Sequence, residues 1–189
     1  MKLLFVDCCI SQRGKESRTL ALAKAYIDAF RAAHPDWEVE RADPMDLPPL
    51  TAEFLDDRDT RKGEFSAPMF AAARQFQSAD SIVVAAPYWD LSYPAQLKTY
   101  IEHISVNGLC YHYTEQGCQG DCKAEKLVYL TSGGDFEGED SVGVLHWKQL
   151  CKMFGIETFT YVFAGGLDID PAKTPELLAQ ACEKARSLV

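Results

Sequence analysis

Residues 2–33 read KLLFVDCCISQRGKESRTLALAKAYIDAFRAA, and this stretch decides the fold. Its first part, Lys2–Val6, is a compact apolar run that ends in polar residues, which predicts a short buried strand. From Ser17 to Ala33 the apolar side chains recur at helical spacing, so a helix should follow and end at His34-Pro35. The chain therefore opens with a strand, a polar loop and a helix.

The same alternation of strand and helix continues along the chain. Further strands are predicted at Trp37–Ala42, Asp80–Ala86, Lys126–Thr131 and Glu157–Phe163. Further helices are predicted at Pro68–Gln77, Pro94–Ser105, Ser141–Phe154 and Thr174–Val189, the last with Thr174 as its N-cap. Strands that alternate with helices form a parallel sheet covered on both faces. We expect a three-layer α/β sandwich over residues 1–189, a single domain with five parallel strands in the order 2-1-3-4-5.

Two segments interrupt this alternation. Residues 43–63 are rich in prolines and charges, which predicts a long loop that is functional or carries helical turns of its own. Residues 107–124 are polar, aromatic and rich in Gly and Cys, and are predicted to form an irregular insertion.

The composition excludes several classes of function. Lys and Arg number 19 against 28 Asp and Glu, and the net charge of −9 argues against nucleic acid or an anionic membrane as a partner. No apolar run approaches the ~20 residues that cross a bilayer, and no signal-peptide core follows Met1. Seven cysteines without an export signal favour a reducing compartment, so we expect a cytoplasmic protein.

Three loops directly follow strands and would share the carboxyl edge of the sheet, where open parallel sheets bind ligands. The first loop runs into a helix, whose free amides and dipole favour a phosphate. Ser11, Ser17 and Thr19 would add hydroxyl donors there. The loop has neither the dinucleotide-binding nor the NTPase glycine pattern, and a plain turn with a serine N-cap would explain the same residues.

The other two loops supply aromatic rings and flexible backbone. Residues 87–94, PYWDLSYP, are suited to a planar heterocycle, or else to capping the sheet or lining an oligomer contact. Residues 131–135, TSGGD, have paired glycines that let the backbone approach a ligand closely, although a plain Gly-Gly turn is equally consistent.

Together these loops resemble those of the flavodoxin-like NAD(P)H:quinone reductase and FMN-dependent azoreductase family, over nearly the whole chain. Ser11, Ser17 and Thr19 match the Ser-x5-Ser-x-Ser/Thr loop that holds the FMN phosphate in that family. The other matching segments are Ala86–Leu91, Pro94–Lys98, Tyr111–Gly117, Ser132–Gly134 and Val162–Gly166. The resemblance implies an FMN site made of Ser11, Ser17, Arg18, Thr19, Pro87, Tyr88, Trp89, Asp90, Leu91, Ser132, Gly133 and Gly134.

The resemblance also implies an activity, the transfer of two electrons from NADH or NADPH to a quinone-like, azo or nitroaromatic acceptor by a ping-pong mechanism. Flavin N5 would carry the chemistry, so no side chain is assigned as catalytic, and His112 and Tyr113 are the candidate helpers. Backbone amides near Trp89 and Gly133 are expected to stabilise negative charge on the ring. A homodimer is expected, with the partner subunit completing the site.

The sequence departs from the family pattern inside the predicted site. Asp90 stands where the azoreductases usually have Asn, and Asp135 and Phe136 stand where they have a basic or histidine residue. A carboxylate beside the flavin would oppose an anionic reduced form.

Two other functions remain open. A flavodoxin-type electron carrier would share the fold, the acidity and FMN, although residues 43–65 and 107–125 are more than a bare carrier needs. A thiol or metal redox protein would use Cys110, Cys118 and Cys122. The spacing of these cysteines matches neither a zinc ribbon nor a ferredoxin, so no metal is predicted.

Overall fold

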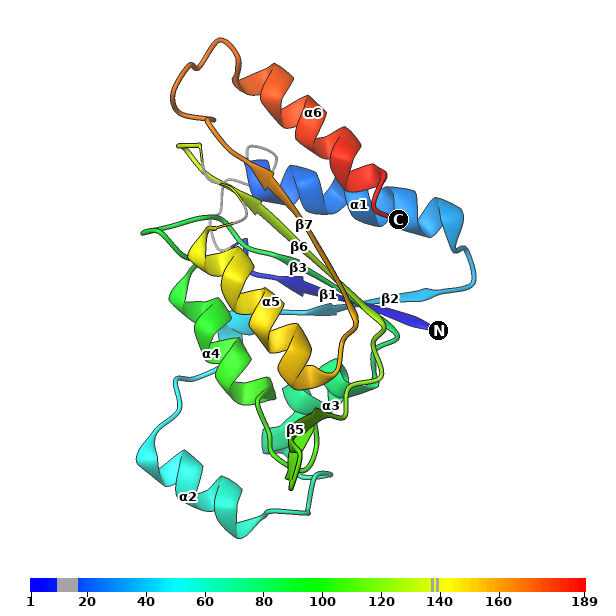
Figure 1. The fold of residues 1–189 in the computed structure, drawn as a ribbon, viewed down its shortest axis with the longest axis vertical. Helices are drawn as coiled ribbons and strands as arrows, with labels where there is room; N and C mark the ends of the chain where they lie inside the picture. Colours follow the sequence, from blue (N-terminus) through cyan, green and yellow to red (C-terminus); the bar gives the residue numbers. More distant parts are fainter. Residues whose placement is uncertain (10–16, 137, 139) are drawn as a thin grey trace.

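The computed structural model describes residues 1–9, 17–136, 138 and 140–189. One sheet contains the strands β1 (Lys2–Asp7), β2 (Glu38–Ala42), β3 (Ser81–Ala85), β6 (Lys126–Ser132) and β7 (Thr158–Ala164). The strands lie in the order β2-β1-β3-β6-β7 and all neighbouring pairs are parallel (Figure 1). Numbered along the chain, this is the predicted order 2-1-3-4-5. The predicted α/β fold is confirmed.

Helices cover both faces of the sheet. One face packs against α1 (Arg18–Ala33) and α6 (Thr174–Arg186). The other packs against α3 (Ala71–Ser78), which follows the short 3-10 helix η3 (Pro68–Phe70), and against α4 (Ala95–Ile104) and α5 (Val142–Phe154). Because the side chains of successive strand residues point to opposite faces of the sheet, each strand contributes side chains to two separate apolar cores.

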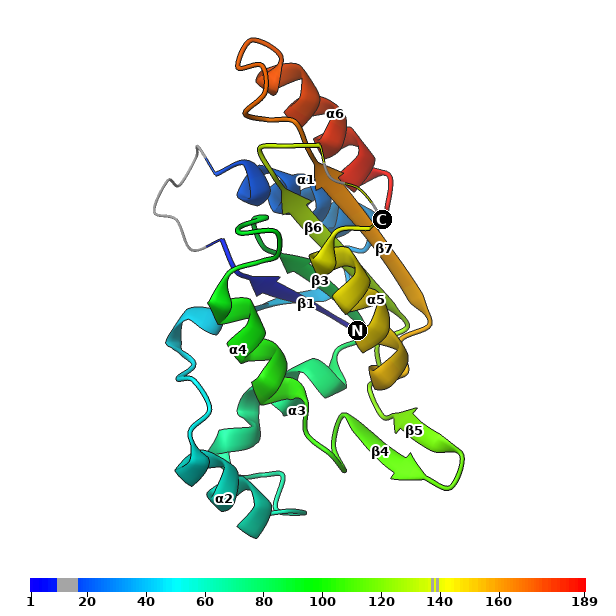
Figure 2. The same cartoon turned by 60° about the vertical axis from the view of Figure 1, so that its left-hand side comes forward.

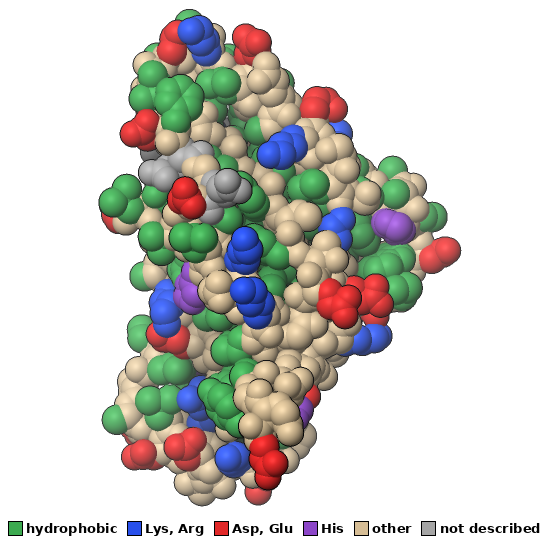
Figure 3. All heavy atoms as spheres, in the orientation of Figure 1, with side chains coloured by type: hydrophobic (Ala, Val, Ile, Leu, Met, Phe, Trp, Pro, Cys, Tyr) green, Lys and Arg blue, Asp and Glu red, His purple; other side chains and the backbone are tan. Residues whose placement is uncertain are grey.

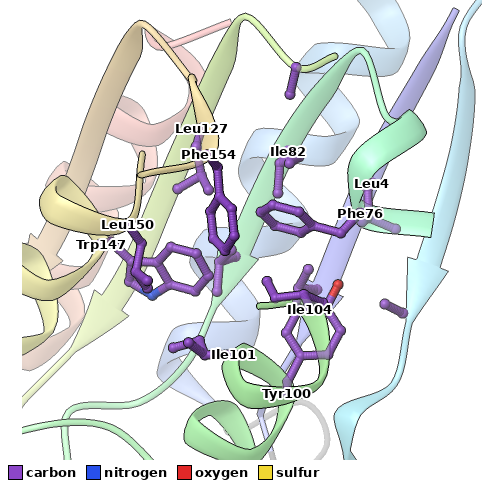
Figure 4. Close-up of a cluster of buried hydrophobic side chains, with 14 of the residues drawn as sticks. Leu4, Phe76, Ile82, Tyr100, Ile101, Ile104, Leu127, Trp147, Leu150 and Phe154 are labelled. Carbon is purple, nitrogen blue, oxygen red and sulfur yellow. The ribbon is translucent and has the colours of Figure 1, made fainter. Parts of the chain in front are cut away.

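The core beneath α3, α4 and α5 is the richer in large rings (Figure 4). Phe154 of α5 packs against Phe76 of α3, with ring centroids 5.0 Å apart, and Trp147 of α5 belongs to the same buried cluster. Each such ring, fully buried, stabilises the fold by roughly 1.5–3 kcal/mol. This core fixes the helices that follow β3 and β6, and with them the loops at the carboxyl edge.

Local sequence accounts for most helix ends. Ser17 is the N-cap of α1, and its Oγ accepts a 3.3 Å hydrogen bond from the amide of Leu20. Gly155, at φ 77°, is the C-cap of α5. The prediction for α6 is wrong by one residue, because Lys173 is its N-cap and the Thr174 hydroxyl instead donates to the carbonyl of Leu167 at 2.8 Å.

The segment predicted as a long loop contains a 3-10 turn, η2 (Pro44–Asp46), and a helix, α2 (Ala52–Thr60). Thr51 caps α2, since its Oγ1 accepts from the amide of Phe54 at 3.1 Å. No residue of α2 is buried, and the helix stands out from the body of the molecule (Figures 1 and 2). A helix without a buried face has no apolar stripe, so periodicity could not reveal it.

The prediction of an irregular insertion at residues 107–124 is wrong. The strands β4 (Tyr111–Thr114) and β5 (Gly117–Gly120) form an antiparallel hairpin, visible in Figure 2. Its turn residues, Glu115 and Gln116, lack the Gly or Asn that marks most tight hairpins. The hairpin docks on the carboxyl end of α5 so closely that a Cβ at Gly120 would lie 2.0 Å from the amide nitrogen of Gly155.

Candidate functional site

A cavity of about 260 Å³ lies at the carboxyl edge of the sheet. The chain runs from β1 to β2 on one side and then crosses to β3 on the other, so the connections after β1 and β3 diverge and leave a crevice between them. The cavity is lined by Cys9, Ser17, Arg18, Thr19, Pro87, Tyr88, Trp89, Ser132, Gly133, Gly134 and Asp168.

Nine of the twelve residues predicted to bind the cofactor line this one cavity. Asp90 and Leu91 do not line it. Ser11 lies outside the described residues. The three loops singled out in the sequence therefore converge, although they are separated by more than a hundred residues of chain.

The first turn of α1 forms the polar end of the cavity. Ser17 caps the helix and Arg18 and Thr19 follow it, with no acidic side chain in that turn. The first amides of a helix have no acceptor within the helix, and their aligned dipoles attract negative charge. Together with the Arg18 guanidinium, this end of the cavity has the chemistry of a phosphate or carboxylate site.

A buried pair of hydroxyls joins the first and third loops. Thr19 Oγ1 and Ser132 Oγ lie 2.6 Å apart, and both side chains are buried. Backbone bonds extend this link, because Tyr88 N donates to the carbonyl of Ser132 at 2.9 Å and Gly133 N donates to that of Ala164 at 3.0 Å. The cavity is thus built on a fixed frame that connects the start of α1, the loop after β3, and the ends of β6 and β7.

Close packing explains the two glycines of the third loop. A Cβ at Gly133 would lie 2.9 Å from the ring of Phe163, and one at Gly134 would lie 2.4 Å from Oδ2 of Asp168. A side chain at Gly133 would require the rings of Phe163 and Tyr88 to shift, and one at Gly134 would require the side chain of Asp168 to turn away. The paired glycines bring the backbone of this loop to the wall of the cavity.

The aromatic loop makes a tight turn at the mouth of the cavity. Trp89 and Ser92 exchange two backbone hydrogen bonds of 3.2 and 2.8 Å, and between them Asp90 and Leu91 have φ values of 51° and 63°. The turn leaves Leu91 69% exposed and Trp89 43% exposed. Tyr88 is anchored by its ring, which meets Phe163 edge to face at 5.3 Å between centroids.

The amides of Trp89 and Gly133 themselves are already engaged. The amide of Trp89 donates to Ser92, and that of Gly133 donates to Ala164. These two hydrogen bonds maintain the loop geometry. Stabilisation of charge on the ring by other backbone amides near Trp89 and Gly133 stays a prediction.

Two acidic side chains contact residues that line the cavity. Asp7, almost fully buried, accepts the amide of Cys9 at 3.0 Å and Nε of Arg41 at 3.1 Å. Burial first, and the charge of Asp7 second, raise the pKa of the Cys9 thiol well above its ordinary value. Cys9 therefore stays protonated at neutral pH and is a poor nucleophile. The second group, Asp168, pairs with Arg18 at 2.7 Å.

Asp168 is a lining residue that the sequence analysis missed. It lies 150 positions from Arg18, in the loop after β7, and no motif marks it. The resemblance ended two residues earlier, at Gly166.

The two candidate helpers lie away from this cavity. His112 and Tyr113 are on the hairpin at the opposite end of the sheet (Figure 2), where His112 Nδ1 lies 2.8 Å from Asp121 Oδ2. Cys110, Cys118 and Cys122 form no metal site, since the described part of the chain holds no group of three or more His, Cys, Asp or Glu side chains placed to bind a metal ion. Hydrogen bonding with Cys110 and burial raise the pKa of Cys122.

The strand order and a cavity with a helix N-terminus, aromatic rings and close backbone at the switch point define a protein of the flavodoxin-like class. The chain belongs to a protein family that is described as having a flavodoxin-like fold. The model of that family matches residues 1–189. No helix within residues 1–9, 17–136, 138 and 140–189 is long and apolar enough to cross a membrane.

Named relatives extend along the full chain. The FMN-dependent NADH:quinone oxidoreductase of Clostridium beijerinckii is 32% identical, with 98% of this chain and 96% of that protein covered. The azoreductase of Bacillus anthracis str. Sterne has a similar structure, with a TM-score of 0.86, 24% identity, and 100% and 98% of the two chains covered. An FMN-dependent NADH-azoreductase from Bacillus anthracis str. Ames Ancestor, solved with FMN, gives a TM-score of 0.80 at 19% identity, covering 99% and 98%.

Proposed function

We propose that this protein is an FMN-dependent oxidoreductase that takes two electrons from NADH or NADPH and passes them to a quinone-like, azo or nitroaromatic acceptor. The observation that carries the proposal is the convergence of nine predicted cofactor residues on one cavity. A relative that is 32% identical over almost the full chain is named an FMN-dependent NADH:quinone oxidoreductase, which supports the choice of cofactor and reaction.

The residues at the polar end of the cavity fit the FMN phosphate. Ser17 Oγ accepts the amide of Leu20 and keeps its own proton free to donate. Arg18 supplies a guanidinium, whereas the hydroxyl of Thr19 is engaged with Ser132, so Thr19 contributes through its amide and by fixing the loop. Ser11 is proposed as a further phosphate ligand.

The walls of the cavity suit the flavin ring. Tyr88 and Trp89 present apolar ring surface, and Ser132, Gly133 and Gly134 bring backbone to the cavity beside Tyr88. FMN, when bound, supplies the hydride-accepting N5 and the return of two electrons to an acceptor. The chain orients the ring and leaves one side of the cavity open for NAD(P)H and then for the acceptor, which supports a ping-pong mechanism. Asp90 and Leu91 lie at the rim of the cavity. They are proposed to contact NAD(P)H or the acceptor rather than the flavin ring.

We also propose a homodimer whose partner subunit completes this site. Its support is apolar surface that one chain leaves uncovered. Several apolar side chains are only partly buried or are exposed to solvent. They are Phe54 and Leu55 of α2, which are half-buried, and Tyr113 of the hairpin and Val142 and Leu145 of α5, which are exposed. Figure 3 shows hydrophobic side chains among lysines and arginines on the face that α4 and α5 form.

A hollow of about 320 Å³ lies on the same face and includes Leu50, Ile101, Leu150 and Met153. In a two-fold dimer, the hairpin of one subunit could reach the cavity of the other and bring His112 and Tyr113 to it. Light scattering should give twice the monomer mass, and a stable, active monomer would contradict the dimer.

We also propose a cytoplasmic location, which the seven free cysteines support.

Steady-state kinetics test the proposed reaction. Protein loaded with FMN should oxidise NADH or NADPH in the presence of a benzoquinone, with parallel reciprocal plots when both substrates are varied. Free FMN at the same concentration is the control. A rate no greater than that of free FMN would refute the proposed function.

A further inference from the structure

The ion pair between Arg18 and Asp168 crosses the mouth of the cavity. Arg18 is the first residue of α1, and Asp168 lies in the loop between β7 and α6. Their Nη1 and Oδ1 atoms are 2.7 Å apart, and both residues line the cavity. The pair thus joins the two walls of the cavity on the side where a phosphate is proposed to bind.

Asp168 is held in place by backbone rather than by side-chain packing. Its amide donates to the carbonyl of Gly134 at 3.0 Å, and its carboxylate lies against Gly134, where a Cβ would approach Oδ2 to 2.4 Å. The side chain itself is 67% exposed, against 35% for that of Arg18. The carboxylate can therefore turn into solvent while the loop backbone stays fixed.

The first turn of α1 contains no acidic side chain of its own, so the carboxylate beside Arg18 comes from this distant loop. A helix N-terminus next to a guanidinium attracts the anion with the most charge. Asp168 brings one negative charge to this end of the cavity, whereas the phosphate of FMN brings nearly two at neutral pH. A neutral ligand brings none and has no means to displace the carboxylate.

We propose that Asp168 is an internal competitor for the phosphate site, and that FMN binds by displacing its carboxylate from Arg18. This inference rests on the proposed function, and it assigns to Asp168 a role in specificity that is separate from the chemistry. The competition weakens FMN binding, prevents singly charged anions from occupying the site, and does not affect flavins without a phosphate.

Binding of flavins to the apoprotein tests the proposal without any turnover. Apoprotein of the wild type and of Asp168→Asn is titrated with FMN and, separately, with riboflavin, and quenching of flavin fluorescence gives the dissociation constants. Asp168→Asn should bind FMN about fivefold more tightly, which corresponds to about 1 kcal/mol, the upper range for an exposed ion pair. Its affinity for riboflavin should change by less than about twofold.

Two further variants isolate the ion pair. Asp170→Asn makes the same charge change in the same loop, but Asp170 pairs with Lys173 and does not line the cavity, so FMN affinity should stay at the wild-type value. In an Arg18→Gln background, which itself weakens FMN, adding Asp168→Asn should have no effect. Equal thermal melts of Asp168→Asn and the wild type show that the fold is retained.

The outcomes separate this inference from the proposed function. Wild-type apoprotein that does not bind FMN would overturn both. Wild type that binds FMN while Asp168→Asn binds it equally or more weakly would overturn only the competition. The competition also fails if riboflavin binding tightens as much as FMN binding, or if the effect of Asp168→Asn persists without Arg18.

Discussion

The hydroxyl pair between Thr19 and Ser132 allows a quantitative test of the frame that holds the cavity together. Replacing Ser132 with Ala removes one hydrogen bond, worth about 1 kcal/mol, and leaves the Thr19 hydroxyl buried without a partner, at a cost of about 1–3 kcal/mol. Thr19→Val removes the same hydrogen bond and leaves the Ser132 hydroxyl without its partner. Each single variant should therefore lose about 2–4 kcal/mol of the free energy of unfolding.

The double variant Thr19→Val/Ser132→Ala leaves no orphaned hydroxyl and should be no less stable than either single variant. Urea denaturation of the four apoproteins, fitted with a shared slope, gives the coupling energy, which we expect to be about 2 kcal/mol or more. Additive losses in the double variant would refute the argument, because they would mean that the two hydroxyls do not depend on each other.

Three other substitutions test particular features. Leu91→Gly should raise the free energy of unfolding by about 0.5–1 kcal/mol, because Leu91 has a positive φ, and a thermal melt that is unchanged or lower contradicts this. Gly120→Ala should undock the hairpin from Gly155 and expose the hairpin amides to hydrogen exchange. Burial first, and Lys98 second, lower the pKa of His146. The unfolded chain therefore binds a proton more readily, and stability should fall from pH 7 to pH 5, less steeply in His146→Gln. Equal slopes would exclude His146.

The strand order and the three loops were predictable because each loop directly follows a fully buried strand. Short runs such as Lys2–Val6 and Asp80–Ala86 leave little doubt about where a strand ends, and the carboxyl ends of parallel strands share one edge. Once the sheet is parallel, residues such as Ser17 and Gly133 must lie near each other, whatever their separation in the chain.

The missed features lack a local signal. Asp168 meets Arg18 only because β7 ends and α1 begins at the same edge of the sheet, and nothing in the residues around Asp168 indicates that contact. The helix α2 buries no residue, and the hairpin turns on Glu115-Gln116, so neither has the pattern from which such elements are predicted. The exposure of Asp90 and Leu91 follows from a turn in which both residues have a positive φ, which the side chain of Leu91 does not favour.

Anaerobic mixing of the FMN-loaded protein with excess NADH and, separately, NADPH tests the central claim most directly. If the cavity formed by the first turn of α1, Tyr88, Trp89 and the paired glycines binds FMN and admits a nicotinamide, one of the two nucleotides should remove the visible flavin absorbance in a single two-electron step. If neither nucleotide reduces the flavin, while titration with dithionite yields a long-lived one-electron-reduced form, the protein is an electron carrier and the proposed function is wrong.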